Sequence, residues 1–239
     1  CETGNATKAA LVWQGFTAEV KRYTYHDLTI YSNSFATLLR QNGLLPGDRI
    51  CVFMDRIPEL YISFLGILKM GGIVQPLFSA FGEDALGMRL EDAKTKAILT
   101  TRKHLGKVRR IRSSLPELSL VIVVDAGEKP LEQGEIAFSM EKAARNEHIE
   151  IATVGPETPS VLHYTSGTTG RPKGALHVHS SVIAQSITTK WVLDVRPDDI
   201  YWCTADPGWV TGTSYGIIGA WANGITQVVL DAGFSAHKW

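Results

Sequence analysis

The sequence has few cysteines, no long apolar run and no excess of charge of either sign. Its three cysteines, Cys1, Cys51 and Cys203, are widely spread and show no CxxC spacing, which argues against both a disulfide framework and a zinc site. Lysine plus arginine and aspartate plus glutamate number 24 each. No global basic field therefore points to nucleic acid as a partner.

The sequence also lacks the usual signs of membrane insertion and export. Charge or glycine interrupts every apolar stretch well before the roughly 20 residues that span a bilayer. No basic-then-apolar signal pattern opens the sequence. We therefore expect a cytoplasmic protein with no membrane partner and with reduced thiols. Cys51 lies within an apolar run and is predicted to be a core residue.

The chain has 239 residues, of which 44% are hydrophobic and 20% charged. This length and composition suit a globular protein with one large domain or two modest ones. The first residue is Cys1 rather than Met, and Trp239 follows shortly after the turn-like Gly233-Phe234-Ser235. We interpret both ends as cut and the sequence as part of a longer protein.

Strand and helix patterns alternate along the chain. Helices are predicted where apolar residues recur at three- and four-residue spacing, as at Leu28, Tyr31 and Phe35. Short apolar runs between turn residues are predicted strands. The predicted helices run from Tyr25 to a stop at Asn42-Gly43, from Pro58 to Gly71-Gly72, and over residues 83–92, 104–113, 138–146 and 180–191. The predicted strands cover residues 10–13, 22–25, 49–54, 73–77, 97–100, 120–124, 160–164, 199–204 and 226–230.

This alternation indicates an α/β fold with a parallel sheet covered on both faces. Residues 126–159 are richer in charge, glycine and proline. A second α/β segment follows this stretch. We therefore predict two parts, residues 1–155 and residues 156–239.

One segment combines the groups that phosphates need. It runs Tyr164-Thr165-Ser166-Gly167-Thr168-Thr169-Gly170-Arg171-Pro172-Lys173-Gly174, directly after an apolar strand. Glycines let backbone N–H groups approach a phosphate closely, hydroxyls add further donors, and lysine adds a positive charge. A flexible surface loop is the alternative interpretation. A Walker A loop is excluded, because Lys173 is followed by Gly174 and Ala175 rather than by Ser or Thr.

The segment YTSGTTGRPKG resembles the signature loop of the adenylate-forming superfamily, which includes acyl-CoA synthetases, luciferases and peptide adenylation domains. The resemblance implies a layered α/β fold, an incomplete copy of that family's N-terminal domain. It also implies that the loop closes over the β- and γ-phosphates of ATP. The implied ATP-binding residues are Thr165, Ser166, Gly167, Thr168, Thr169, Gly170, Lys173 and Gly174, with Thr168 and Lys173 in catalytic roles.

A second motif lies about 30 residues later. The segment DIYWCTADPGWVTG, residues 199–212, reads as a strand running into a tight turn that presents Trp209 and Thr211. Core packing of Trp209 is the alternative. The segment is similar to the corresponding stretch of acetyl-CoA synthetases, where it lines the carboxylate pocket. The resemblance implies that Trp209, Val210 and Thr211 form a wall, and a bulky wall favours acetate or propionate over longer acids.

Basic residues cluster between positions 102 and 112. A solvated helix face is one interpretation. Recognition of the 3′-phosphate of CoA is the other, because arginine binds phosphate with a bidentate fork; the candidates are Arg102, Arg109 and Arg110. His177 and His179 alternate along an extended segment without a third ligand, so we expect no metal site formed by this chain alone.

The resemblance implies an enzyme that activates acetate with ATP and Mg²⁺, forms acetyl-adenylate and transfers the acetyl group to CoA. Family members also carry a magnesium-binding glutamate, a ribose-binding aspartate and a C-terminal domain with a catalytic lysine, and none of these motifs is found here. We therefore expect the chain by itself to be inactive and to need its missing C-terminal domain as a partner. The alternatives are a synthetase for propionate or another short or medium acid, and a non-catalytic nucleotide-binding module.

Overall fold

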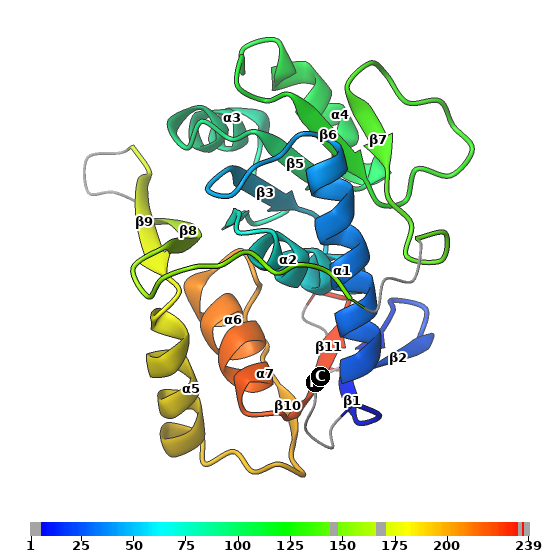
Figure 1. The fold of residues 1–239 in the computed structure, drawn as a ribbon. Coiled ribbons are helices and arrows are strands. Elements are labelled where there is room, and N and C mark those ends of the chain that lie inside the picture. Colours follow the sequence, from blue (N-terminus) through cyan, green and yellow to red (C-terminus); the bar gives the residue numbers. More distant parts are fainter. Residues whose placement is uncertain (1–5, 144–147, 166–170, 234–235, 237–239) are drawn as a thin grey trace.

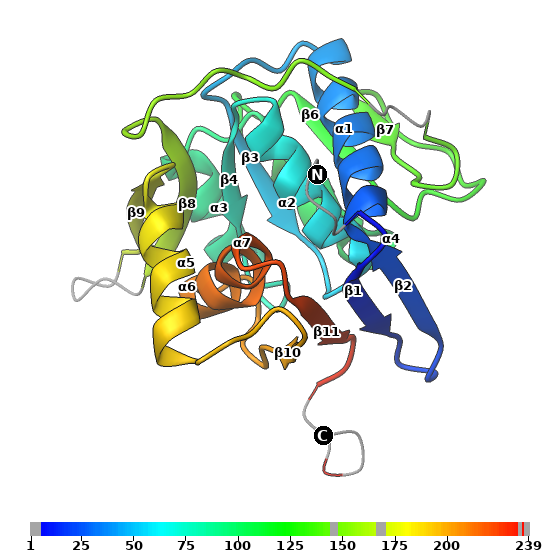
Figure 2. The same cartoon turned by 60° about the horizontal axis from the view of Figure 1, so that its bottom comes forward.

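The computed structural model describes residues 6–143, 148–165, 171–233 and 236. These residues form two sheets with helices packed around them (Figures 1 and 2). The larger sheet has seven strands in the order β7-β6-β5-β3-β4-β8-β9. Its strands are β3 (Arg49–Phe53), β4 (Ile73–Pro76), β5 (Ala97–Thr100), β6 (Leu120–Val123), β7 (Glu135–Ala137), β8 (Pro159–Thr165) and β9 (Lys173–Val178).

Neighbouring strands of this sheet are parallel, except for β8 and β9, which form an antiparallel hairpin. From β3 the chain adds β4 on one side and then crosses back to add β5 on the other. The carboxyl ends of β3 and β5 therefore flank a topological switch point. Ligands of open α/β sheets bind at such a point, beyond the carboxyl ends of the strands.

Helices cover both faces of the larger sheet, which explains its continuous apolar strands. Successive residues of a strand point to opposite faces. Ile50 and Val52 of β3 accordingly pack with α1 (Tyr25–Gln41) and α2 (Pro58–Lys69). Cys51 and Phe53 pack on the other face with α3 (Glu83–Asp92) and α4 (Arg102–Arg112). Cys51 is fully buried, which confirms its predicted core position.

The smaller sheet joins the two ends of the chain, in the order β10-β11-β1-β2. Its strands are β1 (Ala9–Gln14), β2 (Val20–Thr24), β10 (Ile200–Trp202) and β11 (Thr226–Leu230). The chain between β9 and β11 holds α5 (Ser181–Val192) and a helical run composed of α6 (Val210–Thr213), the π-helical segment η1 (Ser214–Gly219) and α7 (Ala220–Ala222). None of the helices among the described residues is both long and apolar enough to cross a bilayer.

The predicted alternation of strands and helices is confirmed, with element ends shifted by one or two residues. The helix predicted over residues 138–146 is wrong for its described part, residues 138–143, which form turns. Phe138 instead anchors this stretch in the core, where its ring lies 4.9 Å from that of Phe35. The predicted division at residues 155 and 156 runs through both sheets, because each takes strands from either side of it. As a division into domains it stays a prediction.

Candidate functional site

The predicted phosphate loop connects the two strands of the β8–β9 hairpin (Figure 1). Thr165, the last residue of β8, pairs with Lys173, the first of β9, and its hydroxyl donates to the Lys173 carbonyl at 3.5 Å. The side chains of Thr165 and Lys173 are exposed. The hairpin therefore brings a hydroxyl and a cationic group together at the base of the loop. Five predicted ATP-binding residues lie outside the described part of the chain: Ser166, Gly167, Thr168, Thr169 and Gly170.

Gly174 follows Lys173 on β9, where a side chain would collide with β8. A Cβ atom at this position would lie 3.0 Å from Cδ1 of Leu162 and 3.6 Å from the ring of Tyr164. Tyr164 is itself tied to the body of the protein, because its hydroxyl donates to Asp92 Oδ2 at 2.6 Å. The base of the loop is thus rigidly attached to the larger sheet and to α3.

The base of the loop lies at the carboxyl edge of the sheet. Strand β8 runs parallel to β4, with Val161 opposite Val74, so the loop after Thr165 and the segment after β4 leave the sheet at the same edge. That second segment holds Phe78, whose ring lies 5.9 Å from the ring of Trp209. The segment after β4 is thus placed against the acyl-pocket motif, at the sheet edge where the fold favours a ligand.

The predicted acyl-pocket residues lie where the chain enters α6. The carboxylate of Asp206 accepts from the Gly208 N–H at 2.8 Å, and its carbonyl accepts from the Trp209 N–H at 2.9 Å. This turn places Trp209, Val210 and Thr211 at consecutive exposed positions, with Trp209 48% exposed. Trp209 is therefore not a core residue of the described chain, and the three side chains are free to form one face of a pocket.

Glycine is required in this turn because the chain segments touch. A Cβ atom on Gly208 would lie 2.5 Å from the backbone nitrogen of Phe78. The turn before α6 is therefore seated directly on the chain after β4. Sequence patterns did not indicate Phe78 as a neighbour of Trp209, since the two residues are brought together only by the fold.

A buried hydrogen bond connects β8 to α6. His163 on β8 lies with its Nε2 atom 2.6 Å from the hydroxyl of Thr213 on α6. Burial, followed by the effect of the neighbouring His177, lowers the pKa of His163 to about 4. The imidazole is therefore neutral at pH 7. The strand that leads into the phosphate loop is thus connected to the helix that begins with the acyl-pocket residues.

A second polar cluster lies at the topological switch point. The carboxylate of Asp55, just after β3, accepts from Lys103 Nζ at 2.8 Å and from the Ser79 hydroxyl at 3.1 Å, and His104 Nε2 lies 3.3 Å away. Burial raises the pKa of Asp55, but the hydrogen bonds from Lys103 and His104 outweigh burial and hold it below its usual value. Asp55 is therefore an anion that ties the start of α4 to the segment after β4.

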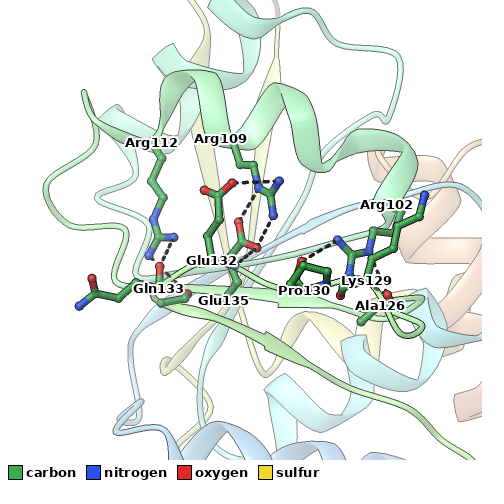
Figure 3. Close-up of polar contacts among 10 residues, drawn as sticks. Arg102, Arg109, Arg112, Ala126, Lys129, Pro130, Glu132, Gln133 and Glu135 are labelled. Atoms are coloured by element: carbon green, nitrogen blue, oxygen red, sulfur yellow. Dashed lines mark hydrogen bonds and ion pairs between the residues drawn. The ribbon is translucent and has the colours of Figure 1, made fainter.

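The arginines predicted to contact CoA all take part in contacts within the chain, and Figure 3 shows those of Arg102 and Arg109. Arg109 binds the carboxylate of Glu135 with two hydrogen bonds of 2.8 Å each, and it also pairs with Glu132. Arg102 donates to the carbonyls of Ala126, Lys129 and Pro130. Arg110 pairs with Glu83 at 2.7 Å. These contacts attach α4 to α3, to β7 and to the residues before β7, and a role in CoA binding stays a prediction.

We expect the substitution Glu135→Gln to lower the free energy of unfolding at pH 7 by about 1–3 kcal/mol, because Arg109 then loses its buried charged partner. The Glu135 side chain is 0% exposed. The hydrogen bonds from Arg109 hold the pKa of Glu135 below its usual value. Its stabilising effect is therefore fully present above the pKa of an unfolded glutamate, about 4.3, and is lost as the pH falls through the lower, folded-state value.

Urea unfolding at a series of pH values tests this prediction. The stability of the unsubstituted chain should fall towards that of the Glu135→Gln variant below about pH 4. Glu132→Gln is the matched control, because Glu132 pairs with the same arginine but is 61% exposed. This substitution should lower the free energy of unfolding by less than about 1 kcal/mol. Equal effects of the two substitutions at pH 7 would contradict the prediction.

Among the described residues, no group of three or more His, Cys, Asp or Glu side chains is placed to hold a metal ion.

Comparison with known proteins agrees with this geometry. A family model described as AMP-binding enzyme matches residues 2–239. The chain is 43% identical to an acetyl-coenzyme A synthetase of Bacillus subtilis (strain 168), with all of this chain and 41% of the relative covered. It is 34% identical to an acetyl-coenzyme A synthetase of Pyrobaculum arsenaticum, with 96% of this chain and 38% of the relative covered. The crystal structure of an acyl-CoA synthetase from Brucella canis resembles it with a TM-score of 0.89 at 27% identity, over 99% of this chain and 42% of that one.

The fold is that of part of an acyl-CoA synthetase, which confirms the predicted layered α/β class. The chain belongs to the AMP-binding enzyme family, and its resemblance to the adenylate-forming proteins is confirmed. The chain spans about two-fifths of the length of the curated relatives named above.

Proposed function

We propose that this chain is part of an ATP-dependent synthetase that activates acetate as acetyl-adenylate and transfers the acetyl group to CoA. One observation carries the proposal. The phosphate-loop hairpin and the acyl-pocket turn are joined at one sheet edge, through the 2.6 Å hydrogen bond between His163 and Thr213. The relatives named acetyl-coenzyme A synthetase support acetate as the acid.

In the first step, a carboxylate oxygen of acetate attacks the α-phosphorus of ATP, and the bond to the β-phosphate breaks. The leaving pyrophosphate gains negative charge. Lys173 and the loop hydroxyls, including those of Thr165 and Thr168, stabilise that charge, and Trp209 and Val210 hold the acetyl group in place. In the second step, the thiol of CoA attacks the acyl carbon, and AMP leaves.

The proposed reaction needs further residues that the described part of the chain does not supply. A magnesium ligand, a ribose ligand and a second catalytic lysine belong to the family and match no motif in this sequence. We therefore expect the 239-residue chain to turn over poorly without the C-terminal domain that the family carries. Arg102, Arg109 and Arg110 are the candidates for CoA phosphate recognition, in competition with their contacts to Glu83, Glu135 and backbone carbonyls.

Carboxylate-dependent ATP–pyrophosphate exchange tests the function in the complete enzyme that carries this chain. A panel of straight-chain acids from acetate to hexanoate should give the highest kcat/KM with acetate. A maximum at propionate or a longer acid would contradict the acetate assignment. The absence of carboxylate-dependent exchange with every acid, together with tight ATP binding in a calorimetric titration, would favour a non-catalytic nucleotide-binding module.

We expect the substitution Trp209→Gly to shift preference from acetate towards longer acids, because it removes bulk from the predicted wall. A pocket contributes about 1–3 kcal/mol per methylene, so the ratio of kcat/KM for butyrate over acetate should rise by roughly tenfold or more. Trp209→Phe is the control, since it keeps an aromatic ring beside Phe78, and it should change the ratio much less. An unchanged ratio in Trp209→Gly would remove Trp209 from the pocket wall.

A further inference from the structure

His163 has an environment that packing alone does not explain. It occupies an inward position of β8, two residues before the end of the strand, and is 4% exposed. Thr213 on α6 is fully buried. The His163 Nε2 atom and the Thr213 hydroxyl oxygen are 2.6 Å apart, although 50 residues separate them in the chain. A leucine would fill a similar volume at position 163 without making this bond.

The hydrogen-bond partners of His163 determine which of its ring nitrogens carries the proton. The Thr213 hydroxyl donates back to the carbonyl of Val210 at 3.0 Å and lies 3.4 Å from that of Trp209. Its single hydrogen is thereby used, so His163 donates through Nε2–H. Within the described part of the chain, the His163 Nδ1 atom has no hydrogen-bond partner. A bare lone pair at Nδ1 is less costly than an unpaired N–H there, which favours the same tautomer.

A short chain of hydrogen bonds connects the two motifs. It runs from the imidazole of His163 to the Thr213 hydroxyl and from there to the carbonyls of Trp209 and Val210, both predicted wall residues. We propose that His163 is a positioning residue that fixes the first turn of α6, and with it the acyl-pocket wall, relative to the phosphate loop. This inference rests on the proposed function of the two motifs.

The fold determines whether β8 or α6 moves when the hydrogen bond between His163 and Thr213 is lost. Strand β8 is held by pairing with β4 on one side and with β9 on the other. The first turn of α6 is exposed at Trp209, Val210 and Thr211. Loss of the bond therefore displaces the wall and leaves the hairpin in place. The bound carboxylate then loses contacts with the wall, so the KM for acetate rises while the KM for ATP changes little.

Nitrogen NMR of the complete enzyme, labelled in its histidines, tests the bond itself, independently of enzyme activity. His163 should show a neutral ring protonated at Nε2 at pH 7, and the substitution Thr213→Val should abolish that preference for one tautomer. A spectrum with the proton on Nδ1, or a charged ring at pH 7, would overturn the inference. The signals are assigned to His163 by their loss in His163→Gln. His177, whose ring centroid lies 5.1 Å away, is the neighbour whose titration must be followed in parallel.

Kinetics of the complete enzyme test the positioning role. His163→Leu and Thr213→Val should each raise the KM for acetate about tenfold and leave the KM for ATP within about twofold. The double variant should be no worse than the poorer single one, because both remove the same bond. His163→Gln can place an amide N–H near the position of Nε2, and Thr213→Ser keeps the hydroxyl; both should retain most of the acetate affinity.

Two kinetic results would also contradict the inference. Equal changes in the KM values for acetate and ATP, accompanied by a lower melting temperature, would mean a structural role only. Additive effects of His163→Leu and Thr213→Val would mean that the two residues act separately. Failure of the proposed function itself looks different, since the unsubstituted enzyme would then show no carboxylate-dependent exchange while the NMR result still held.

Discussion

Replacing Lys173 with methionine is expected to lower the rate of acetate-dependent ATP–pyrophosphate exchange about 100-fold or more in the complete enzyme. Lys173 is the first residue of β9, exposed and paired with Thr165 at the base of the phosphate loop. In the proposed first step its charge stabilises the leaving pyrophosphate. Removing one group that stabilises transition-state charge typically costs 10²–10³ in kcat, or roughly 2.7–4 kcal/mol.

Arg171→Met is the matched control for this experiment. It removes the same charge two residues earlier, outside the paired part of the hairpin. We expect less than about tenfold loss, because a charge that is not held against the developing negative charge contributes little beyond long-range attraction. Similar losses in the two variants would mean that the net charge of the loop matters, and that Lys173 has no specific catalytic role. Circular dichroism of both variants checks that the fold is intact.

Replacing Gly212 with alanine should have the largest effect on stability. A Cβ atom at this position would lie 2.1 Å from the carbonyl oxygen of Asp206 and 2.8 Å from the nitrogen of Pro207. Both neighbours are backbone atoms, so a side chain cannot rotate away to relieve the clash. The Asp206 carbonyl also accepts the hydrogen bond from the Trp209 N–H. We expect a loss of about 3 kcal/mol in the free energy of unfolding.

Gly87→Ala on α3 provides the comparison for Gly212→Ala. The nearest atom to a Cβ at Gly87 is Cδ1 of Ile111 at 4.0 Å, an ordinary contact. Alanine in a helix interior is about 0.5–1 kcal/mol more favourable than glycine. Gly87→Ala should therefore leave stability unchanged or raise it, as measured by urea unfolding. A loss of less than about 1 kcal/mol in the free energy of unfolding of Gly212→Ala would contradict this prediction, because it would mean that the Asp206 turn adjusts to the added methyl group.

The sequence predicted those parts of the fold in which local pattern and burial agree. Strands β3 and β5 each carry an apolar run, Ile50–Phe53 and Ala97–Leu99, because both faces of the sheet are covered, so they are easily recognised. Helix α1 has a regular apolar spacing, and a capping box fixes its start: Thr24 and Asp27 exchange hydrogen bonds between side chain and backbone. Glycine at position 43, with φ of 79°, follows its end.

The elements that sequence patterns missed depend on tertiary contacts. Strand β9 reads KGALHV and is exposed along most of its length, with Leu176 53% exposed. It is a strand because it pairs with β8, and the sequence indicated an extended segment only around His177 and His179. The run from Val210 to Ala222 contains Gly212, Gly216 and Gly219, which disfavour a helix. These glycines allow close contacts with Asp206, Cys203 and Thr189, and that packing outweighs propensity.

The candidate site was predictable only in part, for a similar reason. The Thr165–Gly174 and Trp209–Thr211 motifs are local in sequence, and their resemblance to known motifs identifies them. Phe78 and His163 come from other strands, and nothing in a local pattern assigns them to these motifs. A histidine inside the apolar strand run Val161-Leu162-His163-Tyr164 was the one available signal, because a buried imidazole needs a hydrogen-bond partner.

The pairing of β1 with β11 has a consequence for how the chain folds as it is made. The Thr226 hydroxyl donates to the Ala9 carbonyl across 217 positions of sequence, and the Trp221 indole donates to Ala10. At about 5–20 residues per second, a ribosome needs on the order of 10 to 40 seconds to synthesise that interval. The early hairpin of β1 and β2 therefore waits with an open strand edge until β11 emerges. Such an edge can pair with other chains, so chaperone dependence during synthesis should be concentrated in β1.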